Sequence, residues 1–402
     1  MQSIIKVFTD FALETGFAAF FTQPGAWKYA VMIVVACFLL YLAIVKKFEP
    51  LLLLPIAFGM LLTNLPGAGL YNADIFSGGH VNWQMLTQKG GLIDYLYLGV
   101  KLGIYPSLIF LGVGAMTDFG PLIANPKSLL LGAAAQLGIF VAYLGARLIF
   151  GFDDNLAASI GIIGGADGPT AIFTTIKLAP HLLGPIAIAA YSYMALVPVI
   201  IPMVVKLFCT KKELMINMKE QEKLYPSKTE IKNLRVLKII FPIAVTTIVA
   251  LFVPTAVPLI GMLMFGNLIK EIGSDTSRLF DAAANSIMNA ATIFLGLSVG
   301  ATMTSEAFLN WTTIGIVIGG FLAFALSITG GIFFVKLFNL FSKKKINPLI
   351  GATGLSAVPM ASRVCNEIAT KYDPKNHVLN YCMSSNISGV IGSAVAAGVL
   401  IS

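Results

Sequence analysis

The sequence has few charged residues and few side chains that bind soft metals. Charged residues make up only 11% of its 402 residues, against roughly 25% in ordinary soluble domains. The four cysteines and three histidines are scattered without the spacing of a metal site. The sequence also lacks a glycine-rich loop that would cradle phosphate. These shortages argue against a soluble catalytic domain and against a site for a soft metal.

Long apolar runs stand where charge is missing. Hydrophobic residues make up 57% of the chain and recur in stretches long enough to cross a bilayer, which predicts an all-α polytopic membrane protein. The net charge of +8 does not indicate a nucleic-acid partner, because the basic residues fall in the breaks between apolar runs. The expected spans cover residues 27–45, 51–62, 92–116, 129–150, 183–208, 236–253, 257–269, 282–304, 312–340 and 378–401.

A further apolar segment, residues 156–176, carries a carboxylate among helix-breaking residues. The stretch GGADGPT at 164–170 places Asp167 between glycines and a proline, which break a helix and expose backbone carbonyls. A charged side chain inside a membrane is costly, so Asp167 is a candidate functional residue. Taken alone, the stretch equally fits a kinked helix in which Asp167 caps the following half-helix at Pro169.

Lysine and arginine near the ends of spans mark the cytoplasmic side. The basic stretch 210–234, together with Lys46-Lys47 and Lys343–Lys345, is therefore expected in the cytoplasm. Counting spans from these anchors leaves both ends of the segment 156–176 outside and both ends of residues 348–364 inside. We therefore predict two re-entrant broken-helix hairpins that enter the membrane from opposite faces.

The two predicted hairpins also match in sequence. Residues 165–172 (GADGPTAI) align with residues 351–358 (GATGLSAV) at an offset of 186, and the same offset pairs Gly114-Ala115 with Gly300-Ala301. Each half then has about five spans and one hairpin, and an odd number of crossings gives the halves inverted topology. Inverted repeats with broken helices that meet near the membrane midplane are typical of secondary transporters.

This reasoning divides the chain into four parts. They are an N-terminal amphipathic or spanning helix (1–25), a first membrane repeat (26–209), a cytoplasmic basic linker (210–234) and an inverted second membrane repeat (235–402). The N-terminus lacks a short basic region followed by a small-residue cleavage site, so we expect no removable signal peptide.

Two hairpins that enter from opposite faces would bring several oxygens towards Asp167. These come from Thr170, Asn347, Thr353, Ser356 and the run of residues 384–388 in the last span. One carboxylate with hydroxyl, amide and backbone oxygens suits a hard monovalent cation such as Na⁺, whereas Ca²⁺ usually takes several carboxylates and soft metals take cysteine or histidine. The alternative for each polar residue is a hydrogen bond between helices.

Three further side chains have two interpretations each. Arg363 follows the second hairpin, where it anchors the membrane interface or binds an incoming carboxylate. Tyr191 and Tyr193 lie on an apolar span, where they pack as aromatic residues or relay a proton. The residues alone therefore predict an ion-translocating membrane protein with inverted repeats, and they do not say what powers it.

Three ordered blocks of this sequence resemble one family. They are GGADGPT at 164–170, NPLIGATGLSAVPMASR at 347–363 and NISGVIGSAVAAG at 386–398. The chain is similar to the β subunits of the biotin-dependent sodium-pumping decarboxylases, which act in oxaloacetate, methylmalonyl-CoA, glutaconyl-CoA and malonate decarboxylation. The resemblance covers essentially the whole chain.

The resemblance implies a decarboxylation-driven translocase. A cytoplasmic carboxyltransferase subunit and a biotin carrier would deliver carboxybiotin, which this subunit would decarboxylate, consuming a proton and exporting Na⁺. The implied setting is a prokaryotic plasma membrane, with a small membrane-anchored γ/δ-type subunit and membrane lipid as further partners. The resemblance leaves a homo-oligomer open.

It also implies roles for particular residues. The catalytic residues would be Asp167, Tyr193, Ser356 and Arg363, with Arg363 holding the carboxybiotin. The Na⁺ ligands would be Asp167, Asn347, Gly351, Ser356 and Asn386. The main alternative is an uncoupled secondary transporter such as a Na⁺/carboxylate symporter, which would share the same fold logic. A non-transporting scaffold is a second alternative, although a scaffold needs no buried carboxylate.

Overall fold

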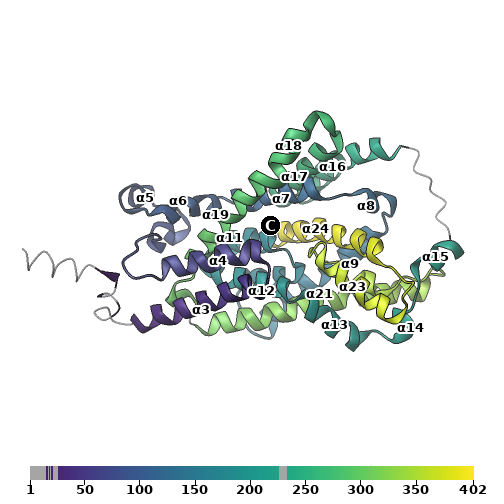
Figure 1. The fold of residues 1–402 in the computed structure, drawn as a ribbon, viewed down its shortest axis with the longest axis horizontal. Coiled ribbons are helices and arrows are strands. Elements are labelled where there is room, and N and C mark those ends of the chain that lie inside the picture. The colour runs from purple at the N-terminus through teal and green to yellow at the C-terminus, as the bar shows by residue number, and fades with distance from the viewer. Residues whose placement is uncertain (1–14, 17, 19, 21–25, 226–232, 309) are drawn as a thin grey trace, which may run out of the picture.

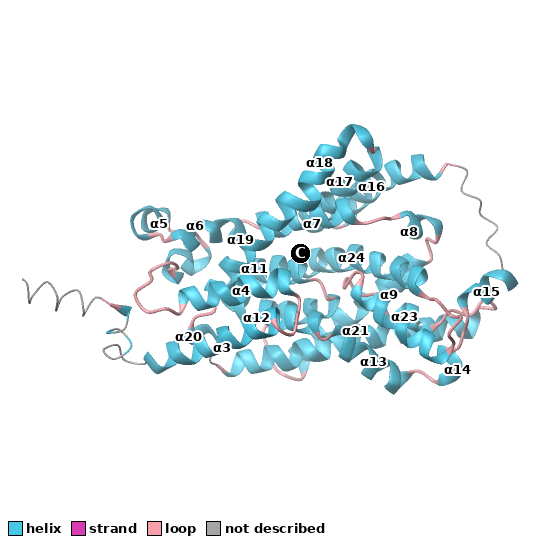
Figure 2. Cartoon of the chain, in the orientation of Figure 1, coloured by secondary structure: helices cyan, strands magenta, loops and turns pink. Residues whose placement is uncertain are grey.

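The computed structural model describes residues 15–16, 18, 20, 26–225, 233–308 and 310–402, and within them every regular element is helical (Figures 1 and 2). The helix predicted over residues 1–25 lies almost wholly outside the described residues.

The main elements of the first half are α3 (Ala26–Ile44), α4 (Pro50–Thr63), α6 (Leu92–Lys101), α7 (Ile104–Met116), α9 (Ser128–Leu148), α10 (Asp154–Gly161), the 3-10 turn η2 (Ile162–Gly165), α11 (Gly168–Leu178), α12 (Leu183–Ala195) and α13 (Val197–Phe208). Those of the second half are α16 (Leu234–Phe252), α17 (Val257–Ile272), α18 (Ser277–Asp281), the π-helix η6 (Ala282–Ile287), α19 (Met288–Ala301), α21 (Trp311–Phe341), α22 (Pro348–Ala352), α23 (Met360–Tyr372) and α24 (Leu379–Ile401). Further short helices include η1 (Ala73–Gly79), α5 (Trp83–Lys89), α8 (Gly120–Ala124), α14 (Lys211–Leu214), α15 (Met218–Leu224) and α20 (Ser305–Phe308).

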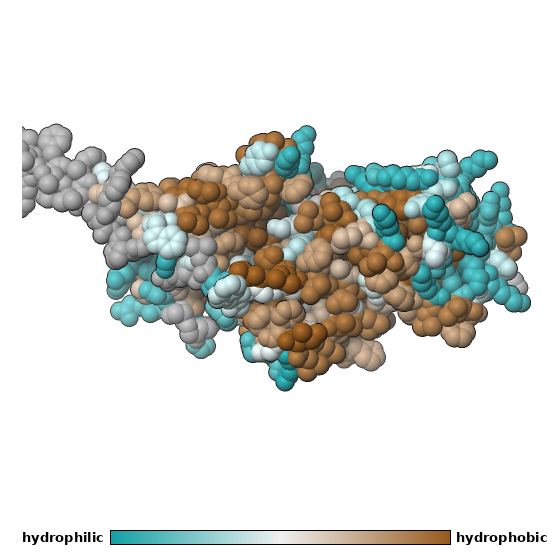
Figure 3. Space-filling model, turned by 90° about the horizontal axis from the view of Figure 1, so that it is seen from below, coloured by the Kyte–Doolittle hydropathy of each residue, from teal (hydrophilic) through white to brown (hydrophobic). Residues whose placement is uncertain are grey.

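Most of these helices are apolar enough for a bilayer. In the described part of the chain, seven are long enough to cross a membrane, or nine if each of two bent helix pairs counts as one span, and α4 is a shorter apolar helix. Large apolar side chains such as Trp27 and Phe341 are exposed on them. Figure 3 shows one face of the molecule, with a largely hydrophobic body and a hydrophilic end where α14 and α15 lie. A polytopic helical membrane protein is therefore confirmed, because soluble monomers rarely expose such large apolar surfaces.

Two spans that the sequence predicts as continuous are broken. The segment 92–116 bends by 66° between α6 and α7, where Gly103 adopts a φ of 72° and Pro106 follows in the first turn of α7. The segment 183–208 bends by 68° between α12 and α13, where Pro198 stands at the start of α13. Proline lacks the backbone N–H of a continuous helix and clashes with the preceding turn, so a new helix begins there.

Two helix pairs, α4 with α19 and α7 with α17, pack with their backbones in close contact. At four positions an added Cβ atom would overlap a backbone carbonyl of the partner helix, so only glycine fits. Gly59 faces Leu297 O, Gly300 faces Ile56 O, Gly114 faces Leu263 O and Gly266 faces Leu111 O.

The two segments predicted as hairpins, residues 156–176 and 348–364, lie in the interior of the molecule. They are called the first and the second broken segment below. One apolar core gathers residues of α9 to α13 and of α21 to α24, and a second gathers α3, α4, α6, α7 and α19 with parts of α11 and α12. Helix α9 packs along α21 and α24, and η2 packs against α9, α21 and α24. The break in the first broken segment, at η2, is therefore enclosed by helices from both halves of the chain.

Candidate functional site

The first broken segment bends at Ala166 and Asp167. Helix α10 tightens into η2, Ala166 adopts a left-handed conformation with a φ of 54°, and α11 begins at Gly168 with Pro169 in its first turn. Asp167 is the N-cap, and its Oδ1 accepts a hydrogen bond from Thr170 N at 3.3 Å. The capping interpretation is therefore correct for one carboxylate oxygen, and the other oxygen, Oδ2, does not take part in the cap.

The second broken segment meets the first at this bend. Helix α22 ends at Ala352, residues 353–359 are not helical, and α23 begins at Met360. Within the bend, Ser356 N donates to Gly165 O at 2.9 Å, so backbone from the two segments is joined directly. Helix α23 continues to Tyr372, beyond the segment 348–364 that the sequence predicts.

A short chain of hydroxyl groups connects the second segment to the carboxylate. Ser393 Oγ on α24 donates to Asp167 Oδ2 at 2.9 Å, and Ser356 Oγ donates to Ser393 Oγ at 2.8 Å. Asp167 has only 9% of its surface exposed, and Ser393 is fully buried. Three segments distant in sequence thus converge on one buried carboxylate.

Ser393 is absent from the residues that sequence reasoning singles out. Its spacing could have identified it, because Ser393 lies seven residues after Asn386 on α24. Seven residues are about two helical turns, so the two side chains share one face of the helix. Another predicted hydroxyl, that of Thr353, donates to Ile350 O and Cys382 O, which ties α22 to α24.

The two candidate tyrosines lie in different surroundings. An added Cβ on Gly168, next to Asp167, would overlap the Tyr191 ring and lie 2.7 Å from its hydroxyl oxygen. That hydroxyl is buried and, among the described residues, has no hydrogen-bond partner. The Tyr193 hydroxyl donates to Val317 O, and its ring contacts Phe321 on α21. Of the two, Tyr191 is therefore the tyrosine that lies against the start of α11.

Asn386 braces the second bend from α24. Its Nδ2 donates to Leu355 O, and its Oδ1 accepts a hydrogen bond from Ser362 Oγ at 3.2 Å. It therefore holds the residue next to Ser356, and through Ser362 it also holds the first turn of α23.

Asn347 and Gly351 make contacts away from Asp167. Asn347 caps α22 by accepting from Leu349 N at 3.0 Å, and its Nδ2 donates to Leu214 O and Ile216 O at 2.9 and 3.0 Å. An added Cβ on Gly351 would overlap the backbone of Gly331, so this glycine lets α22 approach α21. Both residues hold the second segment in place.

Part of the predicted linker is packed against this segment. Asn376 Nδ2 donates to Ile216 O at 2.9 Å, and Asn217 Nδ2 donates to Asp373 Oδ2 at 3.0 Å. The backbone N–H of Lys375, and then the Asn217 side chain, lower the pKa of the Asp373 carboxyl below its ordinary value. Residues 211–224, which include α14 and α15, are therefore hydrogen-bonded to the residues just before α22 and just after α23.

Arg363 remains available for an anion. Its side chain is exposed on the first turn of α23, and within the described residues its guanidinium forms no ion pair. It follows the second bend, and a planar guanidinium there can bind a carboxylate through two parallel hydrogen bonds.

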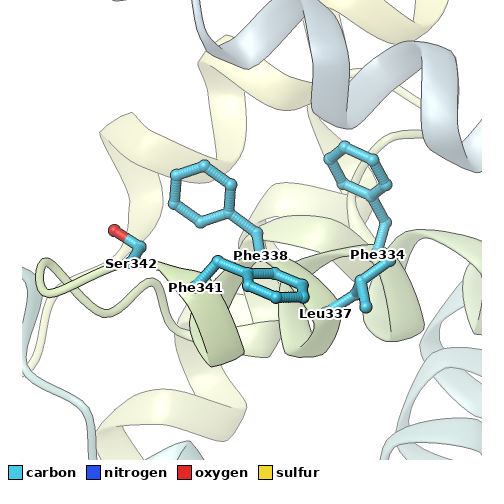
Figure 4. Close-up of a pocket in the computed structure, with 5 residues that line it drawn as sticks. All are labelled: Phe334, Leu337, Phe338, Phe341 and Ser342. Carbon is cyan, nitrogen blue, oxygen red and sulfur yellow. The ribbon is translucent and has the colours of Figure 1, made fainter.

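The oxygens around Asp167 suit a small hard ion. One carboxylate and several hydroxyls and carbonyls converge there. Among the described residues, no three or more histidine, cysteine or acidic side chains cluster in a way that could hold a metal ion. The groove in Figure 4, lined by Phe334, Leu337, Phe338, Phe341 and Ser342, is mainly apolar and lies near the end of α21. It lacks the oxygens that an ion needs.

A multi-pass helical protein with a buried carboxylate where two broken helices meet has the build of an ion-translocating membrane protein. A family model described as the Na⁺-transporting oxaloacetate decarboxylase β subunit matches residues 28–402. The chain therefore belongs to this family, whose members are membrane subunits of multi-subunit decarboxylases. Its role is that of a decarboxylation-driven Na⁺ translocase, and the uncoupled transporter is not favoured.

Full-length relatives carry the names of different decarboxylases. The chain is 52% identical to the methylmalonyl-CoA decarboxylase β subunit of Propionigenium modestum, with 99% of each chain covered. It is 48% identical to the glutaconyl-CoA decarboxylase β subunit of Acidaminococcus fermentans, covering 100% of this chain and 98% of that one. It is 47% identical to the oxaloacetate decarboxylase β chain of Klebsiella pneumoniae, covering 92% and 94%.

Proposed function

We propose that this chain decarboxylates carboxybiotin delivered from the cytoplasmic side, consumes a proton and couples this to Na⁺ export. The observation that carries the proposal is the Asp167–Ser393–Ser356 chain where the two broken segments meet. Relatives with nearly the same length are named for three different acids, which supports a step common to all of them. The donor acid would then be selected by another subunit.

In this proposal Asp167 alternates between a proton and Na⁺. An ionised aspartate at the centre of a spanning helix costs about 2.5–3.5 kcal/mol, so a buried carboxylate favours a bound proton or cation. Na⁺ would displace the proton and take oxygens from Asp167, Ser393 and Ser356. Asn386, Asn347 and Gly351 would hold the second segment in the geometry that this requires, and any direct ligand role for these three rests on the resemblance alone.

Arg363 would hold the carboxylate of carboxybiotin. Its exposure and lack of an ion pair among the described residues support this role. Loss of CO₂ leaves a biotin anion that needs a proton, and a tyrosine would relay it. Tyr193 has this role by resemblance, and the unpartnered hydroxyl of Tyr191 beside Gly168 makes Tyr191 a second candidate.

We further propose that residues 26–209 and 235–402 are inverted repeats. The contacts of α4 with α19 and of α7 with α17 support this. On α7 and α19 the matching residues are 186 positions apart, Leu111 with Leu297 and Gly114 with Gly300, which is also the offset between the two broken segments. The residues that they contact on α4 and α17 are in each case 207 positions apart. The same glycine-to-carbonyl contact would then occur twice, and the broken segments would be hairpins that enter from opposite faces.

The partners of the complex follow from the same proposal. A carboxyltransferase subunit and a biotin carrier would approach from the cytoplasmic side, on which the basic residues of 210–234 would lie. A small membrane-anchored γ/δ-type subunit would complete the complex in a prokaryotic plasma membrane.

The experiment is a decarboxylation assay on the reconstituted complex. Carrier-bound carboxybiotin is supplied with and without Na⁺, and release of CO₂ is measured. The proposal expects Na⁺-dependent decarboxylation that loads vesicles with Na⁺. Sodium transport driven by a carboxylate gradient, without loss of CO₂, would support the symporter instead.

A further inference from the structure

A glutamine on α9 reaches the same bend from a third direction. Gln136 has 4% of its surface exposed, and its Nε2 donates to Gly354 O at 3.0 Å and to Gly389 O at 3.3 Å. Gly354 lies in the bend after α22, and Gly389 lies on α24. One side chain of the first half thus holds two backbone positions of the second half.

These two acceptors fix the orientation of the carboxamide. The nitrogen and oxygen of a glutamine side chain are assigned from their hydrogen bonds. Turning the group over would place Oε1 against two carbonyl oxygens, which accept and cannot donate hydrogen bonds. Nε2 therefore faces Gly354 and Gly389, and Oε1 must face the other way.

The oxygen on that other side has no donor. Gln136 Oε1 is buried and, in the part of the chain that the structure describes, accepts no hydrogen bond. Leaving a buried acceptor unpaired is costly, so such a group in a native protein calls for a partner.

The position of this oxygen places it at the bend of the first segment. A Cβ added to Gly165 would lie 3.5 Å from Gln136 Oε1 and 3.1 Å from Ser393 Cβ. A Cβ added to Gly392 would lie 2.7 Å from Gln136 Cγ, so the side chain fits only because that residue is glycine. Gln136 Oε1 and Ser393 therefore both lie near the place where a Gly165 side chain would be, and Ser393 is the residue that donates to Asp167.

A second buried oxygen lies at this bend. Thr170 Oγ1, in the first turn of α11, is buried beside the Asp167 carboxylate. Buried oxygens that gather at one place suit a dehydrated hard cation, which binds oxygen ligands only.

We propose that Gln136 is a specificity-determining residue whose Oε1 binds the transported Na⁺. Ion binding then alters the hydrogen bonds that its Nε2 donates to the second segment and to α24. The proposal rests on the proposed function, in which Na⁺ binds at Asp167. A cation that draws Oε1 towards Gly165 also displaces the amide nitrogen from Gly354 and Gly389. Ion binding then changes the geometry of the bend that carries Ser356.

The test compares Na⁺-dependent thermal stabilisation of the purified full-length chain in its wild-type and variant forms. A bound ion stabilises the folded protein by RT ln(1 + c/Kd), where c is the Na⁺ concentration. The rise of the Tm with Na⁺ concentration therefore gives the Kd, here called the Na⁺ midpoint because the site is half occupied at that concentration, without any turnover. Gln136→Met keeps the size of the side chain and removes its oxygen. Losing one interaction with a charged group raises the Na⁺ midpoint about 10- to 150-fold, and the selectivity for Na⁺ over Li⁺ changes.

A second variant covers the case in which Gln136→Met does not fold. Gln136→Glu keeps an oxygen at this place and adds a second titratable charge beside Asp167, so its Na⁺ midpoint falls more steeply with rising pH than the wild-type midpoint does. The matched control is Ser298→Ala, which removes another buried, unpartnered oxygen, on α19, and leaves the midpoint unchanged.

The failure of this inference is distinct from the failure of the proposed function. A Gln136→Met protein with the wild-type midpoint and selectivity would show that Gln136 only braces the bend. A Gln136→Glu midpoint with the same pH dependence as the wild type would show the same. An Asp167→Asn protein that keeps the wild-type midpoint would overturn the proposed function itself.

Discussion

Replacing Ser393 by alanine is the most informative perturbation of the hydroxyl chain. The substitution removes the donor to Asp167 Oδ2 at 2.9 Å and the acceptor for Ser356 Oγ at 2.8 Å. Hydrogen bonds to a charged group contribute about 1.5–3 kcal/mol. At 1.36 kcal/mol for each factor of ten, this corresponds to a loss of Na⁺ affinity of about 10- to 150-fold.

The assay is the Na⁺ concentration that gives half-maximal decarboxylation by the reconstituted complex. Ser388→Ala is the matched control, because Ser388 lies on the same helix and donates to Leu129 O at 3.2 Å, away from the carboxylate. We expect Ser393→Ala to need far more Na⁺ than Ser388→Ala at comparable stability. Identical Na⁺ requirements in the two variants would refute the reasoning, because Ser393 would then be one more hydroxyl between helices.

Three further predictions concern the neighbours of Asp167. Gly168→Ala inserts a methyl group against the Tyr191 ring, and such overpacking lowers the free energy of unfolding by about 1–3 kcal/mol; denaturation in detergent measures it, and wild-type stability would contradict the contact. Tyr191→Phe should slow Na⁺-dependent decarboxylation without loss of thermal stability, because the Tyr191 hydroxyl has no hydrogen-bond partner among the described residues. Tyr193→Phe removes the hydrogen bond to Val317 O and should cost about 1 kcal/mol of stability. Slower decarboxylation by Tyr193→Phe and lower stability of Tyr191→Phe would exchange the roles of the two tyrosines. Arg363→Lys should raise the KM for carboxybiotin more than the Na⁺ requirement, because lysine lacks the planar fork; equal losses would make Arg363 structural.

Much of the fold could be predicted because it follows from apolar length and charge. All ten expected spans coincide with helices, two of them as bent pairs. The breaks at Gly103 and at Pro198 were missed because hydropathy averages over a window in which one glycine or proline changes little. The break at Asp167 was predicted because glycine, aspartate and proline stand together there.

The site could be predicted only in part. Asp167 and Ser356 could be found from their bent segments, but a single serine on a small-residue helix, such as Ser393, looks like helix packing until the partner helix is placed. Gln136 carries no sequence signal, because one buried amide in an apolar span resembles any interhelical hydrogen bond. The packing of residues 211–224 was missed because a lysine-rich stretch indicates solvent exposure.

The central claim is that Asp167 is the ion-binding residue where the two broken segments meet. The most direct measurement is Na⁺ uptake into proteoliposomes that hold the complete complex, driven by decarboxylation, with the wild-type protein compared with Asp167→Asn. The account predicts uptake by the wild type and none by Asp167→Asn, with both proteins folded and assembled. Sodium uptake by Asp167→Asn at the wild-type rate would contradict it.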